Sequence, residues 1–116
     1  MSDYTIYHNP RCSKSRNSLA LLEENGIKPR VVLYLDQPLV PAEIKELLAK
    51  LGITASQLVR RGEAAYKESG LSAASTDSEI IKAMAASPKL IERPIVVAGK
   101  RAVLGRPPEN VLELIA

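Results

Sequence analysis

The sequence predicts an α/β fold in which a four-stranded mixed sheet is flanked by helices and interrupted by an inserted helical region. Strand and helix patterns alternate at the start, helical patterns alone follow, and two strand patterns with a final helix end the chain. With 116 residues, 46% of them apolar, the chain is long enough for one substantial core. We therefore expect a single domain over residues 1–116, with the helical insertion at about 40–88.

The first part of the chain reads as strand, helix, strand. Residues 5–8 alternate polar and apolar side chains and predict a short strand, which Asn9-Pro10 ends. A helix is expected from about residue 12 to Asn25-Gly26, where glycine is a good C-terminal stop. The near-continuous apolar run at 31–35 is typical of a strand that is buried on both faces.

Three helical patterns follow. Residues 41–52 have a proline in the first turn, an apolar stripe at spacings of three and four, and a closing glycine. Thr54-x-x-Gln57 and Thr76-x-x-Glu79 are capping-box patterns. The first predicts a short helix through Arg60 and the second a helix that stops at Ser87-Pro88.

The last part of the chain predicts a hairpin and a helix. Residues 94–98 and 102–104 are apolar strand patterns around a Gly99-Lys100 turn, and Pro107-Pro108 starts a terminal helix. The first two strands, joined by a helix, should be parallel, and the hairpin strands antiparallel. This is the element order of the thioredoxin fold with helices inserted in the middle.

Composition excludes several classes of protein. One cysteine excludes an internal disulfide, a CxxC redox pair and a cysteine-rich zinc site, and one histidine excludes the common multi-histidine metal sites. We therefore expect no metal and no bound cofactor. The N-terminus has no signal-like apolar stretch and no run is long enough to cross a membrane, so we expect a soluble, cytoplasmic protein without a membrane partner. Nothing indicates oligomerisation, and a monomer is the default.

The net charge of +3 is unevenly placed. Residues 1–16 carry +2 and residues 88–108 carry +4, whereas the stretch between them and the last eight residues are net acidic. The overall charge is too mild to indicate a nucleic-acid partner, and four aromatic residues are few for base stacking. If the fold brings the two basic segments together, they form an anion site.

Cys12 is the main candidate for chemistry. It stands at the predicted N-terminus of a helix, where the helix dipole and backbone N–H groups favour a thiolate. The dipole alone usually supplies less than the roughly 2 kcal/mol that half-ionisation at neutral pH requires. Neighbouring cations such as Arg16, and the serine hydroxyls, would have to supply the rest. The alternative is a small buried apolar residue, but its surroundings are polar.

Other candidates depend on context. His8 could lower the pKa of Cys12 or relay a proton, and the alternative is a solvated histidine at a strand end. Arg60 and Arg61 could simply cap a helix C-terminus. Arg93 and Arg106 each lie beside a proline just outside an apolar strand, where a rigid guanidinium suits bidentate binding of a tetrahedral oxyanion. Pro94 is a candidate cis proline.

Residues 8–16, HNPRCSKSR, resemble the active-site segment of the glutaredoxin-dependent arsenate reductases. The similarity continues through residues 58–60, 91–97 and 104–107 and covers essentially the whole chain in order. The family has a thioredoxin-like fold with an inserted helical region. The resemblance implies the following roles: Cys12 as the nucleophile that attacks arsenate; Arg60, Arg93 and Arg106 as oxyanion-binding residues; His8 and Ser15 as stabilisers of the thiolate; and Pro94 as the cis proline.

The cysteine count constrains that chemistry. Reduction of arsenate takes two electrons, and one thiol cannot supply them by closing an internal disulfide. The resemblance implies glutathione as co-substrate and glutaredoxin as the partner that removes it. Two alternatives remain: another glutathione-dependent thiol reductase, or an Spx-like redox-responsive transcription regulator. Many of the latter have a CxxC motif at this place, where this chain has Ser15.

Overall fold

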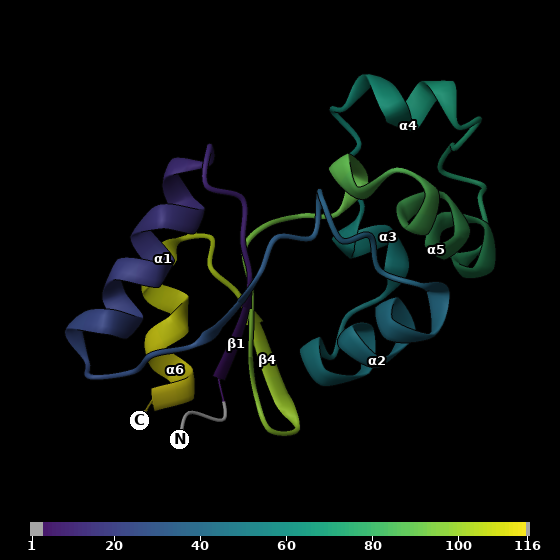
Figure 1. The fold of residues 1–116 in the computed structure, drawn as a ribbon. Helices are drawn as coiled ribbons and strands as arrows, with labels where there is room; N and C mark the ends of the chain where they lie inside the picture. The colour runs from purple at the N-terminus through teal and green to yellow at the C-terminus, as the bar shows by residue number, and fades with distance from the viewer. Residues whose placement is uncertain (1–3, 116) are drawn as a thin grey trace. The chain divides into compact units, whose positions relative to one another are not determined.

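The computed structural model describes residues 4–115. It has two compact units, and all strands of the described residues lie in one of them. The sheet unit consists of the chain up to Tyr34 and from Arg93 onward, and the helical unit is Leu35–Glu92. Figure 1 shows the chain leaving the first two strands, passing through the helical unit and returning to the last two. The helical unit is therefore an insertion within the sheet unit.

The sheet has four strands in the order β2-β1-β3-β4. Their bounds are Tyr4–Tyr7 for β1, Arg30–Val32 for β2, Ile95–Ala98 for β3 and Arg101–Leu104 for β4. β1 and β2 are parallel, whereas β1–β3 and β3–β4 are antiparallel. The predicted α/β class, the mixed four-stranded sheet and the thioredoxin-like order of elements are confirmed.

Helices from both ends of the chain pack on this sheet. They are α1 (Ser13–Glu24), the 3-10 helix η2 (Pro108–Val111) and α6 (Leu112–Ile115). In Figure 1 α1 and α6 lie on the same side of the strands. Ile6 of β1 and Val96 of β3 form a core with Leu22, Val111 and Leu114 of these helices. Burying each such aliphatic side chain contributes about 1.5–3 kcal/mol to the stability of the fold.

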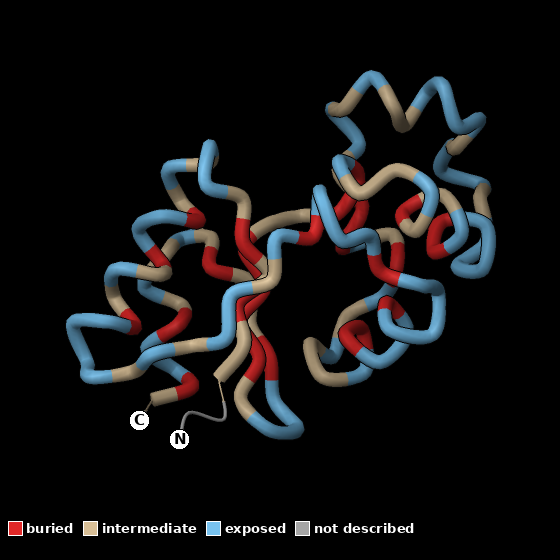
Figure 2. The backbone as a smooth tube through the Cα atoms, in the orientation of Figure 1, coloured by how far each residue is buried: buried red, intermediate tan, exposed pale blue. Residues whose placement is uncertain are grey.

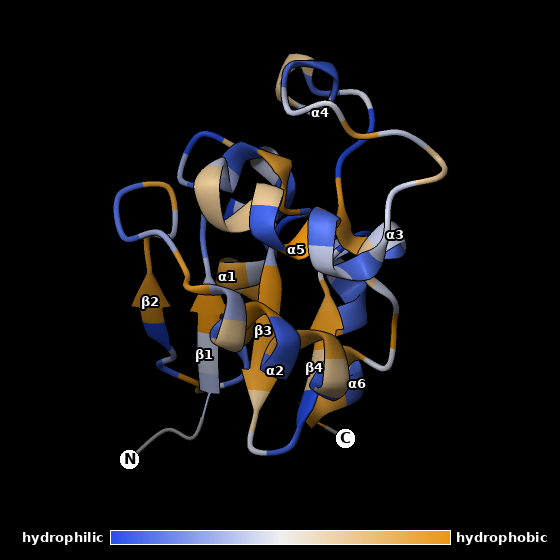
Figure 3. Cartoon of the chain, turned by 90° about the vertical axis from the view of Figure 1, so that its right-hand side faces the viewer, coloured by the Kyte–Doolittle hydropathy of each residue, from blue (hydrophilic) through white to orange (hydrophobic). Residues whose placement is uncertain are grey.

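The second strand differs from its prediction. The apolar run 31–35 predicts a strand buried on both faces, but β2 ends at Val32 and lies at the sheet edge. Val31 is 43% exposed and Leu33 36% exposed, and the chain turns at 34–36. An apolar run indicates a strand but does not distinguish an edge from the centre of a sheet. The strand that is mostly buried is β3, in which the first three of the four residues are buried. Its apolar residues are orange in Figure 3.

The helical unit contains α2 (Pro41–Leu51), α3 (Ala55–Leu58), α4 (Ala64–Glu68), α5 (Asp77–Ala86) and the 3-10 helix η1 (Pro88–Leu90). Buried side chains of α2, α3 and α5 form its interior. α3 is shorter than predicted, because Val59 leaves it to form a β-bridge with Ile91. α4 was not predicted from the sequence, and none of its residues is buried, as its pale blue and tan trace in Figure 2 shows.

The capping box at the start of α5 is expected to stabilise the helical unit. Thr76 Oγ1 accepts the Glu79 N–H at 3.2 Å, and Glu79 Oε1 accepts the Thr76 N–H at 2.8 Å. Thr76→Ala should lower the free energy of unfolding by about 1 kcal/mol. Urea denaturation measures this difference, with the exposed first-turn change Ser78→Ala as the control. Equal stability of the two variants would contradict the capping role.

Candidate active site

Cys12 stands directly before α1, in a position that the preceding turn defines. Its N–H donates to the Asn9 carbonyl at 3.0 Å, and its carbonyl accepts the Arg16 N–H at 3.0 Å. Cys12 is thus the N-cap of α1, with extended backbone angles of φ −93° and ψ 122°. The thiol is half-buried, and the free N–H groups of the first helical turn converge on this end of the helix. The predicted placement at a helix N-terminus is confirmed.

The groups around the Cys12 sulfur together lower the pKa of the thiol. Burial is the largest single influence and raises the pKa, because it disfavours the charged form. Four interactions outweigh it: a hydrogen bond from the Ser15 N–H, the charge of Arg93, a hydrogen bond from the Lys14 N–H, and one from the Arg93 side chain. The thiolate is the nucleophilic form of cysteine, and Cys12 is therefore ionised at lower pH than a free cysteine.

Arg93 comes to this sulfur from the other basic segment of the chain. It lies two residues before β3. The Arg93–Pro94 peptide bond is cis, in agreement with the prediction for Pro94, and the Arg106–Pro107 bond is also cis. Arg106 Nη1 donates to the Arg93 carbonyl at 3.4 Å. The sheet unit therefore brings Cys12, Arg93 and Arg106 together, and the two basic segments of the sequence meet.

His8 and Ser15 form a buried pair beside the thiol-bearing turn. His8 Nδ1 and Ser15 Oγ share a hydrogen bond of 2.7 Å, and Ser15 Oγ also accepts the Asn9 N–H at 3.0 Å. His8 is 6% exposed and Ser15 is fully buried. The pair ties the end of β1 to the first turn of α1. The contact of Ser15 with the Cys12 sulfur is through its backbone N–H.

The pKa of His8 is lowered by burial and by the positive charge of Arg16. A buried neutral histidine stabilises the fold above the pKa of the unfolded state, and this stability is lost as the pH falls through the folded-state pKa. Between about pH 7.5 and about pH 5.5 an unfolded histidine gains its proton. We therefore expect the free energy of unfolding to fall less over this range in His8→Gln than in wild type. Urea denaturation at the two pH values tests this, and identical pH dependence in both proteins would contradict it.

Arg16 is exposed on the outside of this turn. Its Nη1 donates to the Pro10 carbonyl at 3.0 Å, and its charge acts on His8. A direct action of Arg16 on the Cys12 thiolate stays a prediction.

Arg60 belongs to the helical unit and is held there by backbone and side chain. Its N–H donates to the Leu90 carbonyl at 2.7 Å. Its guanidinium forms ion pairs with Glu63 at 3.7 Å and with Glu92 at 3.5 Å, and its side chain is 25% exposed. The neighbouring Arg61 is exposed. Arg60 therefore has a defined orientation within its unit, and its part in oxyanion binding stays a prediction.

The arrangement around Cys12 suits attack on an anionic electrophile. A nucleophile with a lowered pKa lies beside a guanidinium and at a helix N-terminus, where N–H groups and the dipole favour anions. A planar guanidinium can bind two oxygens of a tetrahedral oxyanion at once. The site can therefore hold an oxyanion and offset its charge while a thiolate approaches.

The model of the ArsC family matches residues 7–114. The chain belongs to the ArsC family. This agrees with the family that the active-site segment resembles.

Relatives of this ArsC-family chain are similar over nearly their whole length. It is 54% identical over 112 residues to the uncharacterized protein YfgD of Escherichia coli K12, covering 95% of this chain and 94% of YfgD. It is 46% identical over 113 residues to an arsenate reductase of Neisseria meningitidis serogroup A, covering 96% and 97%. The solved structure of an arsenate reductase from Vibrio cholerae superposes with a TM-score of 0.91 at 49% identity, covering 95% of each chain.

Asn9 also shapes the site of this ArsC-family chain, although its sequence pattern predicts only a turn. Asn9 uses three groups: its carbonyl accepts the Cys12 N–H, its N–H donates to Ser15 Oγ, and its Oδ1 accepts the Arg11 N–H at 3.0 Å. Asparagine before proline is a known turn signal, and side-chain capping of a nearby N–H is its usual means. That signal predicts the end of the first strand, but it does not show that Asn9 positions the thiol.

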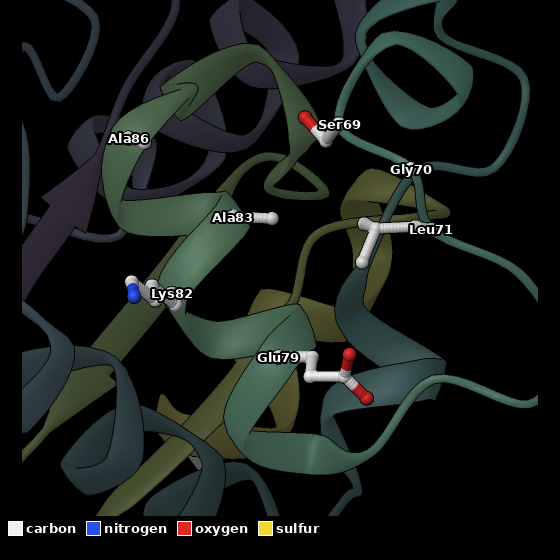
Figure 4. A pocket seen from close by; sticks show the side chains of 7 residues that line it. All are labelled: Ser69, Gly70, Leu71, Glu79, Lys82, Ala83 and Ala86. Atoms are coloured by element: carbon white, nitrogen blue, oxygen red, sulfur yellow. The ribbon is translucent and has the colours of Figure 1, made fainter.

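A cavity of about 400 Å³ lies in the helical unit. Figure 4 shows that its lining comes from α5 and from the turn after α4: Ser69, Gly70, Leu71, Glu79, Lys82, Ala83 and Ala86. None of the predicted site residues lines it. Over the described residues 4–115 there is no cluster of three or more possible metal ligands and no helix that could span a membrane.

Proposed function

We propose that this chain reduces arsenate to arsenite, with the Cys12 thiolate as nucleophile and with glutathione and glutaredoxin as external thiol donors. The observation that carries the proposal is the environment of the Cys12 sulfur, which has a lowered pKa and a hydrogen bond from Arg93. The names of the relatives from N. meningitidis and V. cholerae support arsenate as the oxyanion.

In the first step the Cys12 sulfur attacks arsenic, an S–As bond forms, and one arsenate oxygen leaves as water after protonation. Arg93 and Arg106 bind the remaining oxygens. Their contribution is positioning together with electrostatic stabilisation of the charge that builds up on the oxyanion. Arg60 stays a predicted oxyanion-binding residue, on the resemblance of residues 58–60 to the family motif.

The two electrons come from two external thiols. Glutathione replaces a second oxygen and forms its own S–As bond. A glutaredoxin thiolate then attacks the glutathione sulfur, the new S–S bond forms, and the electron pair of the broken S–As bond stays on arsenic, which becomes As(III). Hydrolysis releases arsenite and returns Cys12 as a thiol. Because thiols supply both electrons, the reaction requires no metal or bound cofactor. External thiol donors are available in a reducing compartment, so a cytoplasmic location is part of the proposal. A monomer stays the default expectation.

The test is arsenate-dependent oxidation of NADPH in a mixture of this protein, glutathione, glutaredoxin and glutathione reductase. We expect turnover that stops when arsenate, glutathione or glutaredoxin is omitted. Turnover no higher than the mixture without this protein would refute the proposal. If Cys12 forms a mixed disulfide by attack on oxidised glutathione, releasing one glutathione thiol, but arsenate gives no turnover, the chain is a different glutathione-dependent thiol reductase.

A further inference from the structure

Gly105 lies between β4 and Arg106, buried where three parts of the sheet unit meet. Its N–H donates to the Pro94 carbonyl at 2.9 Å, which extends the β3–β4 ladder beyond its last strand pair. Its carbonyl accepts a hydrogen bond from Ser18 Oγ at 3.4 Å. Gly105 is therefore bonded both to the strand that follows Arg93 and to the helix that follows Cys12.

There is no room for a side chain at Gly105. A Cβ there would collide with Ser18 Oγ, lie 2.7 Å from Pro94 Cγ and lie 3.2 Å from Ser18 Cβ. The other five glycines have open space at the same place. Ser18 is fully buried and Pro94 less than 2% exposed, so neither can move aside into solvent. A larger residue at 105 would have to push α1 and the start of β3 apart.

The elements that meet at Gly105 are those that carry the site. Ser18 lies on α1, whose N-terminus holds the Cys12 thiol; Pro94 directly follows Arg93; and Arg106 directly follows Gly105. We propose that Gly105 is a positioning residue, whose bare backbone sets the distance between the Cys12 end of α1 and the two arginines. The part of this inference that concerns oxyanion binding rests on the proposed function, whereas the part that concerns the thiol does not.

The mechanism is a matter of distance. A charge-assisted hydrogen bond is short and directional, and the attraction between a guanidinium and a thiolate weakens as they separate. A displacement of about 1 Å by a substitution away from the reacting atoms can reduce the rate by about 100-fold. Methyl-sized expansion at Gly105 would act on the Cys12–Arg93 contact and on the place of Arg106 at once.

Gly105→Ala is the direct test, with Gly62→Ala as a matched control, because Gly62 has open space and no positive φ. The pKa of Cys12 is measured from the pH dependence of its alkylation by iodoacetamide, which needs no arsenate. We expect the thiol pKa to rise in Gly105→Ala and kcat/KM for arsenate to fall by about 10- to 100-fold, mainly through KM. Adding Ser18→Ala removes the atom of closest contact and should partly restore both values.

The outcomes separate the possibilities. A folded Gly105→Ala protein with the thiol pKa and the KM of wild type, or a change equal to that in Gly62→Ala, overturns the positioning role. If Gly105→Ala does not fold, Ser18→Thr adds a methyl group from the helix side of the same contact, and its thiol pKa decides in the same way. If Gly105→Ala raises the thiol pKa and the wild-type protein does not turn over arsenate, the positioning role is supported and the proposed function is refuted.

Discussion

Cys12→Ser is expected to abolish arsenate-dependent NADPH oxidation. The hydrogen bonds from the Ser15 and Lys14 N–H groups and from Arg93 stabilise a thiolate, whereas a serine hydroxyl does not ionise near neutral pH. We expect activity to fall by about 10⁴-fold or more, to the background of the coupled assay. Because Cys12 is the sole cysteine of the chain, the variant should also take up no iodoacetamide.

Asn17→Ala is the control for this variant, because Asn17 is exposed on the same helix. Near-normal activity in Asn17→Ala and none in Cys12→Ser would assign the chemistry to the sulfur rather than to the fold of α1. Activity in Cys12→Ser within about tenfold of wild type would mean that another group attacks arsenate, since such a difference is only about 1.4 kcal/mol in barrier.

The elements that were predicted well have strong local signals. The helix at Pro41–Leu51 combines a proline in its first turn, an apolar stripe and Gly52, which ends it with a φ of +70°. Such features depend on neighbours within a few residues, so they are readable from the sequence. α4 lacks them, because it buries no residue and so has no apolar stripe to detect. The burial of β2 was mispredicted because its place at the sheet edge depends on pairing with distant residues.

The candidate site divides in the same way. The thiol at a helix N-terminus is a local feature, and the polar sequence around Cys12 indicated it. The group that completes the site, Arg93, is 81 positions away from Cys12, and spacing alone favoured nearer cations such as Arg16. The charge that lowers the pKa of Cys12 is that of Arg93, which the fold of the sheet brings to the sulfur. The resemblance of the motifs, and not periodicity, linked the two residues.

Arg93→Ala is expected to raise the pKa of Cys12 and to weaken oxyanion binding in one change. It removes both the charge and the side-chain hydrogen bond that favour the thiolate. A hydrogen bond to a charged group is worth about 1.5–3 kcal/mol, so kcat/KM for arsenate should fall at least about 10- to 150-fold. The pH at which alkylation of Cys12 is half-maximal should move upward, because more alkaline conditions are then needed to form the thiolate.

Two further variants separate the two roles of Arg93. Arg93→Lys keeps the charge but loses the planar guanidinium. It should therefore preserve much of the lowering of the Cys12 pKa, whereas KM for arsenate should rise. Lys100→Ala removes one positive charge at the exposed β3–β4 turn and should change neither quantity, which controls for net charge. An unaltered thiol pKa in Arg93→Ala would contradict the geometry of the site. If Arg93→Lys and wild type have equal kinetics, the oxyanion requires only a positive charge at position 93. Bidentate binding by the guanidinium would then be excluded.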